Sequence, residues 1–87
     1  MAEPPDIRRK RLLFRSRHRG TKESDLLMGG FAEAHLPTMS EQQLDSYETL
    51  LNATDPELFD WLAGRGTPPS DDAAHLINLL KNFKIRP

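Results

Sequence analysis

The chain has 87 residues, of which 37% are apolar and 29% charged, and it contains no cysteine. This length supports one modest hydrophobic core, and the missing cysteine excludes a disulfide framework, a thiolate metal site and a cysteine nucleophile. The longest apolar runs, such as Leu26–Met28, are far shorter than the roughly 20 residues that cross a bilayer. We therefore expect a small chain that does not span a membrane.

The charges are divided unevenly along the chain. Residues 1–22 hold eight Lys or Arg and two acidic residues, a net charge of +6. The rest holds four basic and eleven acidic residues, a net charge of −7, although the whole chain has a formal charge of only −1. The two parts therefore carry electrostatic fields of opposite sign.

The first predicted helix runs from about Asp6 to His18 and is followed by Gly20, which breaks it. Its apolar stripe is predicted from the 3.6-residue period, and the opposite face is basic. The stripe consists of Ile7, Arg11, Phe14 and His18, widened by Leu12 and Leu13.

A second helix is predicted from about Lys22 to Leu36, where Pro37 ends it. Gly29 and Gly30 stand inside it, at a cost of roughly 0.5 to 1 kcal/mol each relative to alanine. Either close helix packing or the approach of a partner's backbone would explain them. The predicted inner side consists of Leu26, Leu27, Phe31 and Ala34.

Three further helices complete the chain. Ser40 and Gln43 have the spacing of a capping box, and Ser70 caps the last helix. Between them, Asp55 before Pro56 is the predicted N-cap of a helix that stops near Gly64. The predicted inner faces are Leu44, Tyr47, Leu50 and Leu51 in the third helix, Leu58, Phe59, Trp61 and Leu62 in the fourth, and Ala73, Leu76, Ile77, Leu80 and Phe83 in the fifth.

No run of alternating β-branched residues indicates a strand, so the fold class is all-α. We expect a single-domain bundle of about five short helices spanning residues 1–87. The N-terminal residues 1–5 and the C-terminal residues 84–87 are expected to be flexible.

Catalytic patterns are absent from the sequence. His18, His35 and His75 are far apart on separate predicted helices, and neither metal-ligand spacing nor a nucleophile arrangement accompanies them. No glycine-rich loop joins a strand to a helix, so a nucleotide-binding fold has no support. We expect no catalytic residue, no metal site and no enzymatic activity, and we expect the chain to work by binding another protein.

The segment Arg19-Gly20-Thr21-Lys22-Glu23 stands where the charge changes sign. Gly20 permits positive φ and close approach of another backbone, Arg19 offers a planar guanidinium, and Glu23 supplies an acceptor at a helix start. The three groups can form a compact recognition edge. The alternative is that Gly20 only stops a helix and Glu23 only pairs with the helix dipole. A second Arg-Gly-Thr at Arg65–Thr67 lacks the glutamate.

The sequence RGTKESD after a basic helix resembles the RGxxE signature of the SdhE family, the succinate dehydrogenase flavoprotein assembly factors. FAEAHLPTMSEQQLDSYETLL is similar to the middle of the mitochondrial members, and DPELFDWL resembles the fourth-helix segment of bacterial ones. The resemblance covers roughly residues 7 to 83, with order and spacing preserved.

The resemblance implies a helical bundle that binds the flavoprotein subunit of succinate dehydrogenase, and in some bacteria that of fumarate reductase. It also implies that the protein promotes covalent attachment of FAD to a histidine of the partner. Because the sequence has no phosphate cradle or aromatic cage, we expect no stably bound cofactor. We also expect the chain to be a monomer. The partner-binding residues carried over are Arg19, Gly20 and Glu23, with Arg15, Arg17 and Asp25 as flanking candidates.

A nucleic-acid-binding module is the alternative, because seven Arg or Lys between Arg8 and Arg19 could neutralise several phosphates. The acidic remainder argues against it, as does the expectation that no exposed aromatic side chain lies among the basic residues for base stacking. Acidic residues and prolines in the first six positions are unlike a secretory or transit peptide. We therefore expect a bacterial cytoplasm rather than a mitochondrial matrix.

Overall fold

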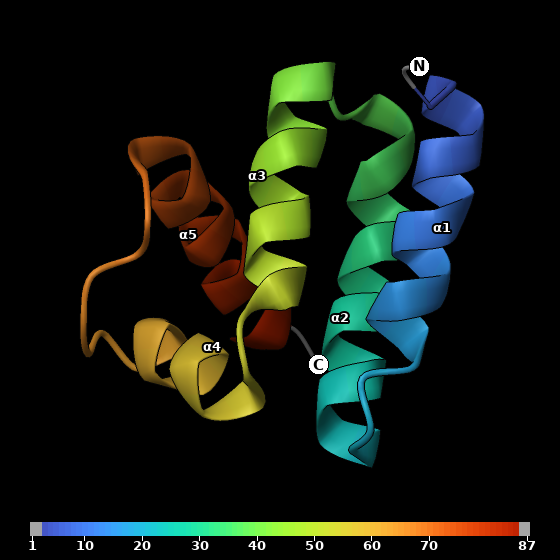
Figure 1. Ribbon diagram of the computed structural model, residues 1–87. Coiled ribbons are helices and arrows are strands. Elements are labelled where there is room, and N and C mark those ends of the chain that lie inside the picture. Colours follow the sequence, from blue (N-terminus) through green and yellow to red (C-terminus); the bar gives the residue numbers. More distant parts are fainter. Residues whose placement is uncertain (1–2, 86–87) are drawn as a thin grey trace. The chain divides into compact units, whose positions relative to one another are not determined.

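The computed structural model describes the backbone of residues 3–85 and the side chains of residues 3–83. The fold class is all-α, as predicted, and no strand occurs within residues 3–85. Figure 1 shows the helices in chain order. They are α1 (Pro5–Arg17), α2 (Lys22–His35), the short 3-10 helix η1 (Leu36–Thr38), α3 (Glu41–Asn52), α4 (Asp55–Leu62) and α5 (Asp71–Ile85).

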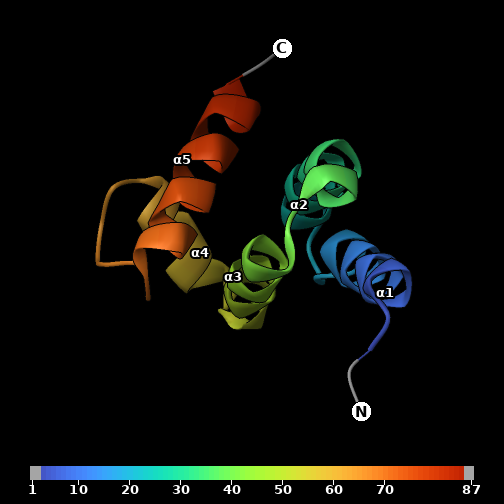
Figure 2. The ribbon, with the colours of Figure 1, turned by 90° about the horizontal axis from the view of Figure 1, so that it is seen from above.

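The chain divides into two compact units, with the boundary between Leu44 and Asp45. In the first unit, α1 and α2 run antiparallel and pack against each other, and η1 contacts both (Figures 1 and 2). In the second unit, α4 packs against α5. The single domain and the flexible ends at 1–5 and 84–87 stay predictions, and residues 1, 2, 86 and 87 lie outside the described range.

Two helix starts follow the predicted capping chemistry. Before α3, the Gln43 N–H donates to the Ser40 hydroxyl oxygen at 3.2 Å, and the Ser40 N–H donates to the Gln43 side-chain carbonyl at 2.9 Å. Before α5, the Ala73 N–H donates to the Ser70 hydroxyl oxygen at 3.1 Å. Each contact satisfies a backbone donor that has no partner inside its helix.

The start of α4 differs from the prediction by one residue. Thr54, not Asp55, is the N-cap, because its hydroxyl oxygen accepts the Glu57 N–H at 3.3 Å. Asp55 is the first helical residue, where its charge favours the positive end of the helix dipole. The helix ends at Leu62, and Gly64 follows with a φ of +82°.

The apolar faces predicted for α3 and α5 are confirmed. Both follow the helical period without interruption by polar residues. Buried in α3 are Leu44, Tyr47, Leu50 and Leu51, and buried in α5 are Ala73, Leu76, Ile77 and Leu80, with Phe83 half-buried. No described helix is both long enough and apolar enough to cross a membrane.

The stripe predicted for α1 is confirmed at Leu12 and wrong at Ile7, Phe14 and His18, which are exposed. Ile7 and Phe14 are 56% and 64% exposed, whereas Leu12 and Ser16 are fully buried. Leu12 and Ser16 are one turn apart, so the buried face of α1 is rotated away from the more apolar stripe.

Polar groups on the inner side of α1 are satisfied by hydrogen bonds. Arg9 donates through Nε to the Leu36 carbonyl oxygen at 3.0 Å and through Nη2 to the Met39 carbonyl oxygen at 2.7 Å. The Ser16 hydroxyl donates to the Leu12 carbonyl oxygen at 2.7 Å. These bonds remove the penalty for burying polar groups, so this face can be turned inward.

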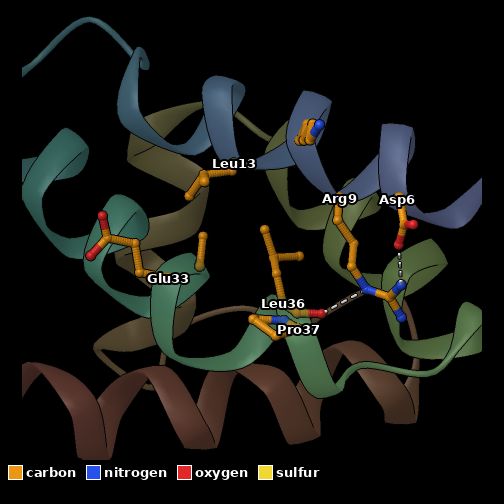
Figure 3. A pocket seen from close by; sticks show the side chains of 8 residues that line it. Asp6, Arg9, Leu13, Glu33, Leu36 and Pro37 are labelled. Atoms are coloured by element: carbon orange, nitrogen blue, oxygen red, sulfur yellow. Dashed lines mark hydrogen bonds and ion pairs between the residues drawn. The ribbon is translucent and has the colours of Figure 1, made fainter.

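Packing of α1 against α2 and η1 leaves a hollow of about 390 Å³ in the first unit. Figure 3 shows Arg9 and Leu13 on α1 facing Leu36 and Pro37, with Asp6 3.8 Å from a terminal nitrogen of Arg9. The Arg9 guanidinium beside this hollow already pairs with Asp6 and donates hydrogen bonds to the Leu36 and Met39 carbonyl oxygens. Its role there is to join α1 to the end of α2 and to η1.

The inner face of α2 also differs in part from the prediction. Phe31 is buried as expected, but Leu26 is 67% exposed, Ala34 is exposed and Leu27 is half-buried. Three of the buried residues, Ser24, Gly29 and Ala32, are small and let α1 approach closely. Small residues contribute little to the periodic pattern of large apolar side chains from which a buried face is predicted. The buried residues are Ser24, Met28, Gly29, Phe31 and Ala32.

Candidate functional site

The RGxxE segment forms the turn between α1 and α2 and the first residues of α2. Gly20 has a φ of +115°, a conformation that glycine was expected to permit at this position. A Cβ atom placed on Gly20 would meet no heavy atom within 4 Å. The requirement for glycine is therefore conformational, because the surrounding space would accommodate a larger residue.

Two side chains at the start of α2, its N-cap Thr21 and Asp25 of its first turn, fix the backbone here. The Asp25 Oδ1 atom accepts the Arg19 N–H at 2.6 Å and the Gly20 N–H at 3.2 Å. Thr21 is the N-cap of α2, and its hydroxyl oxygen accepts the Ser24 N–H at 3.3 Å. Asp25 therefore has an internal role that the sequence did not indicate, and its contact with a partner stays a prediction.

Arg19 is fixed by the same turn of α2. Its Nε donates to the hydroxyl oxygen of Ser24 at 3.0 Å, and Ser24 is fully buried. The Arg19 side chain is half-buried, so its direction is set by the protein itself. Sequence reasoning missed Thr21 and Ser24, although threonine directly before a predicted helix is a preferred N-cap residue.

Glu23 is the exposed acidic group of the motif. It lies in the first turn of α2, and within the described part of the chain it makes no hydrogen bond or ion pair. The positive end of the helix dipole favours a carboxylate at this position. Its acceptor oxygens are nevertheless available to a partner molecule. Gly20 and Glu23 are thus both exposed, whereas the half-buried Arg19 side chain is bonded to the buried Ser24.

Arg17 joins the end of α1 to the middle of α2. It forms an ion pair with Glu33, and its Cγ atom would lie 3.0 Å from a Cβ atom placed on Gly29. Close helix packing therefore accounts for Gly29, one of the two explanations left open by the sequence. Arg15, the other flanking candidate, is half-buried on α1.

Several cations of the basic helix are engaged within the chain. Arg9 binds backbone carbonyls, Arg17 pairs with Glu33, and Arg11 pairs with Glu3 at 2.9 Å. Phosphate binding by these arginines would have to replace contacts that already exist. Fewer cations of the basic helix are therefore available to neutralise phosphates of a nucleic acid than the sequence suggested.

The expectation that no exposed aromatic side chain lies among the basic residues is wrong. Phe14 is 64% exposed in the middle of α1. Its ring centroid lies 4.2 Å from that of His18, with the planes tilted by 34°. One face of the ring is therefore occupied by the side chain of the C-cap residue of α1.

The histidines have separate environments. His18 contacts Phe14 in a tilted arrangement, His35 is stacked with Phe31 at 4.4 Å between ring centroids, and His75 is exposed on α5. Among the described residues, no three His, Cys, Asp or Glu side chains are grouped so that they could hold a metal ion.

The second Arg-Gly-Thr segment has a local structural role. Arg65 contacts Asp60 of α4 at 3.0 Å, and Gly66, with a φ of +71°, allows the chain to turn beside Trp61. This copy is explained by the end of α4.

Comparison with known proteins gives a consistent result. Residues 10–84 match the model of a family described as flavinator of succinate dehydrogenase. The FAD assembly factor SdhE of Acetobacter pasteurianus is 45% identical over 80 residues, which cover 91% of this chain and 73% of that protein.

Mitochondrial proteins named succinate dehydrogenase assembly factor 2 are also similar. The protein of Caenorhabditis briggsae is 45% identical over 79% of this chain and 58% of its own length. That of Saccharomyces cerevisiae is 46% identical over 94% of this chain and 51% of its own length. The chain thus spans only about half the length of these mitochondrial relatives, and the family match includes the whole RGxxE turn.

Proposed function

Because this chain belongs to the family of succinate dehydrogenase flavinators, we propose that it binds the flavoprotein subunit of succinate dehydrogenase and promotes covalent attachment of FAD to a histidine of that subunit. The observation that carries the proposal is the RGxxE turn. Internal hydrogen bonds to Asp25 and Ser24 fix its backbone and the Arg19 side chain, while Glu23 stays exposed. A fumarate reductase flavoprotein is a second client that the family resemblance implies.

The proposed mechanism is positioning. The turn holds the flavoprotein subunit in a conformation in which its histidine and its bound isoalloxazine ring react with each other. Placing reacting groups correctly can lower a barrier by several kcal/mol without any covalent contribution from the factor. The chain itself is proposed to act as a monomer in a bacterial cytoplasm, with no catalytic residue and no stably bound flavin.

Co-expression with the flavoprotein subunit of succinate dehydrogenase tests this function. We expect the covalent flavin of that subunit, measured as acid-stable fluorescence in a denaturing gel, to rise when the chain is present. A complex of the two proteins should also be isolated by size-exclusion chromatography. If the fluorescence is the same with and without the chain and no complex forms, the proposal is wrong. Nucleic acid would then be the next ligand to test.

A Glu23→Gln substitution tests how the exposed carboxylate acts. The change keeps the size of the side chain but removes its charge, and hydrogen bonds to charged groups contribute about 1.5 to 3 kcal/mol. We therefore expect binding to the flavoprotein subunit to weaken by about tenfold or more, and covalent flavin at limiting factor concentration to fall in parallel. Unchanged binding combined with lost flavin would instead assign proton transfer to Glu23.

A further inference from the structure

A groove opens on the surface of the first unit beside the RGxxE turn. It has a volume of about 380 Å³ and lies between the end of α1 and the middle of α2. Arg17 and Asp25, which flank the motif, form part of its wall. The other lining residues are Leu26, Gly29, Gly30 and Glu33.

The charged groups around the groove are already compensated. Arg17 and Glu33 form an ion pair with each other. The Asp25 carboxylate accepts the backbone N–H groups of Arg19 and Gly20. An ionic ligand would have to displace one of these contacts, so the groove favours an uncharged occupant.

Apolar contact is what the groove offers. Leu26 is 67% exposed, while Gly29 and Gly30 have no side chain to fill the space beside it. Gly29 is packed against Arg17, whereas Gly30 is only half-buried. A partner's backbone can therefore approach α2 most closely at Gly30, the second of the two explanations for the glycine pair.

The groove is continuous with the RGxxE turn. Leu26 follows Glu23 by three residues, so the two lie on adjacent turns of the same side of α2. Both are exposed. A partner bound to the turn could therefore contact Leu26 along the same side of α2.

We propose that the groove binds an apolar side chain of the flavoprotein subunit, with Leu26 as the contact and Gly30 as the point of close backbone approach. This inference rests on the proposed function and extends its binding surface from the turn along α2. Burial of an exposed leucine against an apolar group supplies affinity that the compensated charges of the groove do not.

The first test compares Leu26→Gln with Ile7→Gln in binding to the purified flavoprotein subunit. Both substitutions replace an exposed apolar side chain in a helix by glutamine, which has good helix propensity. We expect the dissociation constant to rise about fivefold or more for Leu26→Gln, the effect of losing a central interface contact. Ile7→Gln, outside the groove, should stay within about twofold of the original chain.

The second test is Gly30→Gln, which places a side chain at the groove. Because glutamine favours a helix more than glycine does, the melting temperature should be unchanged or higher, while binding weakens. A purely structural role for Gly30 would lower the melting temperature instead. If both variants bind as the original chain does while Gly20→Arg loses binding, the groove proposal is wrong and the proposed function stands. If the original chain itself does not bind, the proposed function fails and the groove proposal fails with it.

Discussion

Replacing Gly20 by arginine is expected to lower the covalent flavin of the co-expressed flavoprotein subunit by at least about tenfold. A φ of +115° costs a non-glycine residue on the order of 1–3 kcal/mol, which the turn can relieve only by moving. Such movement separates the Arg19 and Gly20 N–H groups from Asp25 and redirects the motif. The measurement is acid-stable fluorescence in a denaturing gel, with circular dichroism to establish that the variant is folded.

Gly64→Arg is the matched control for this experiment. Gly64 also has a positive φ, +82°, and a Cβ atom there would also meet no heavy atom within 4 Å. It lies after α4, outside the RGxxE turn. Gly64→Arg should suffer comparable strain but keep flavin attachment. Equal loss in both variants would attribute the effect to stability, and full attachment with a folded Gly20→Arg would exclude the turn as the site.

Replacing Asp25 by alanine is expected to have the second largest effect. The change removes the acceptor of two backbone N–H groups at 2.6 and 3.2 Å, so the free energy of unfolding should fall by about 1–2 kcal/mol. Flavin attachment should fall as well, because Arg19 and Gly20 are no longer held in place. Urea denaturation and the gel assay measure the two effects separately.

Asp25→Asn distinguishes positioning from direct contact. Asparagine keeps an acceptor oxygen at the same place, so it should restore most of the stability and most of the flavin attachment if Asp25 positions the turn. If stability returns but attachment does not, the charge of Asp25 contacts the partner, and the internal role is secondary.

Local chemistry explains which elements could be predicted from the sequence. Ser40 and Ser70 each accept a backbone N–H only three residues further along, so their capping roles depend on local spacing alone. The positive φ of Gly20 was predictable for the same reason, since glycine between two helices is a local signal.

The inner face of α1 could not be predicted, because it depends on groups distant in the sequence. Arg9 can turn inward only because carbonyl oxygens 27 and 30 residues later accept its N–H groups. Periodicity therefore favoured the more apolar stripe with Ile7 and Phe14, which is exposed. In the candidate site, the bonds from Asp25 back to Arg19 and Gly20 were likewise invisible, since they require the turn geometry itself.

The hydrogen bonds of Arg9 also affect the expected kinetics of association with a partner protein. The α1–α2 pair is joined at one end by the turn bonded to Asp25 and at the other by Arg9, through the Leu36 and Met39 carbonyl oxygens. A pair fastened at both ends has little conformational entropy left to lose on association. Binding should then follow simple bimolecular kinetics without a slow ordering phase, and loosening the Arg9 end should introduce one.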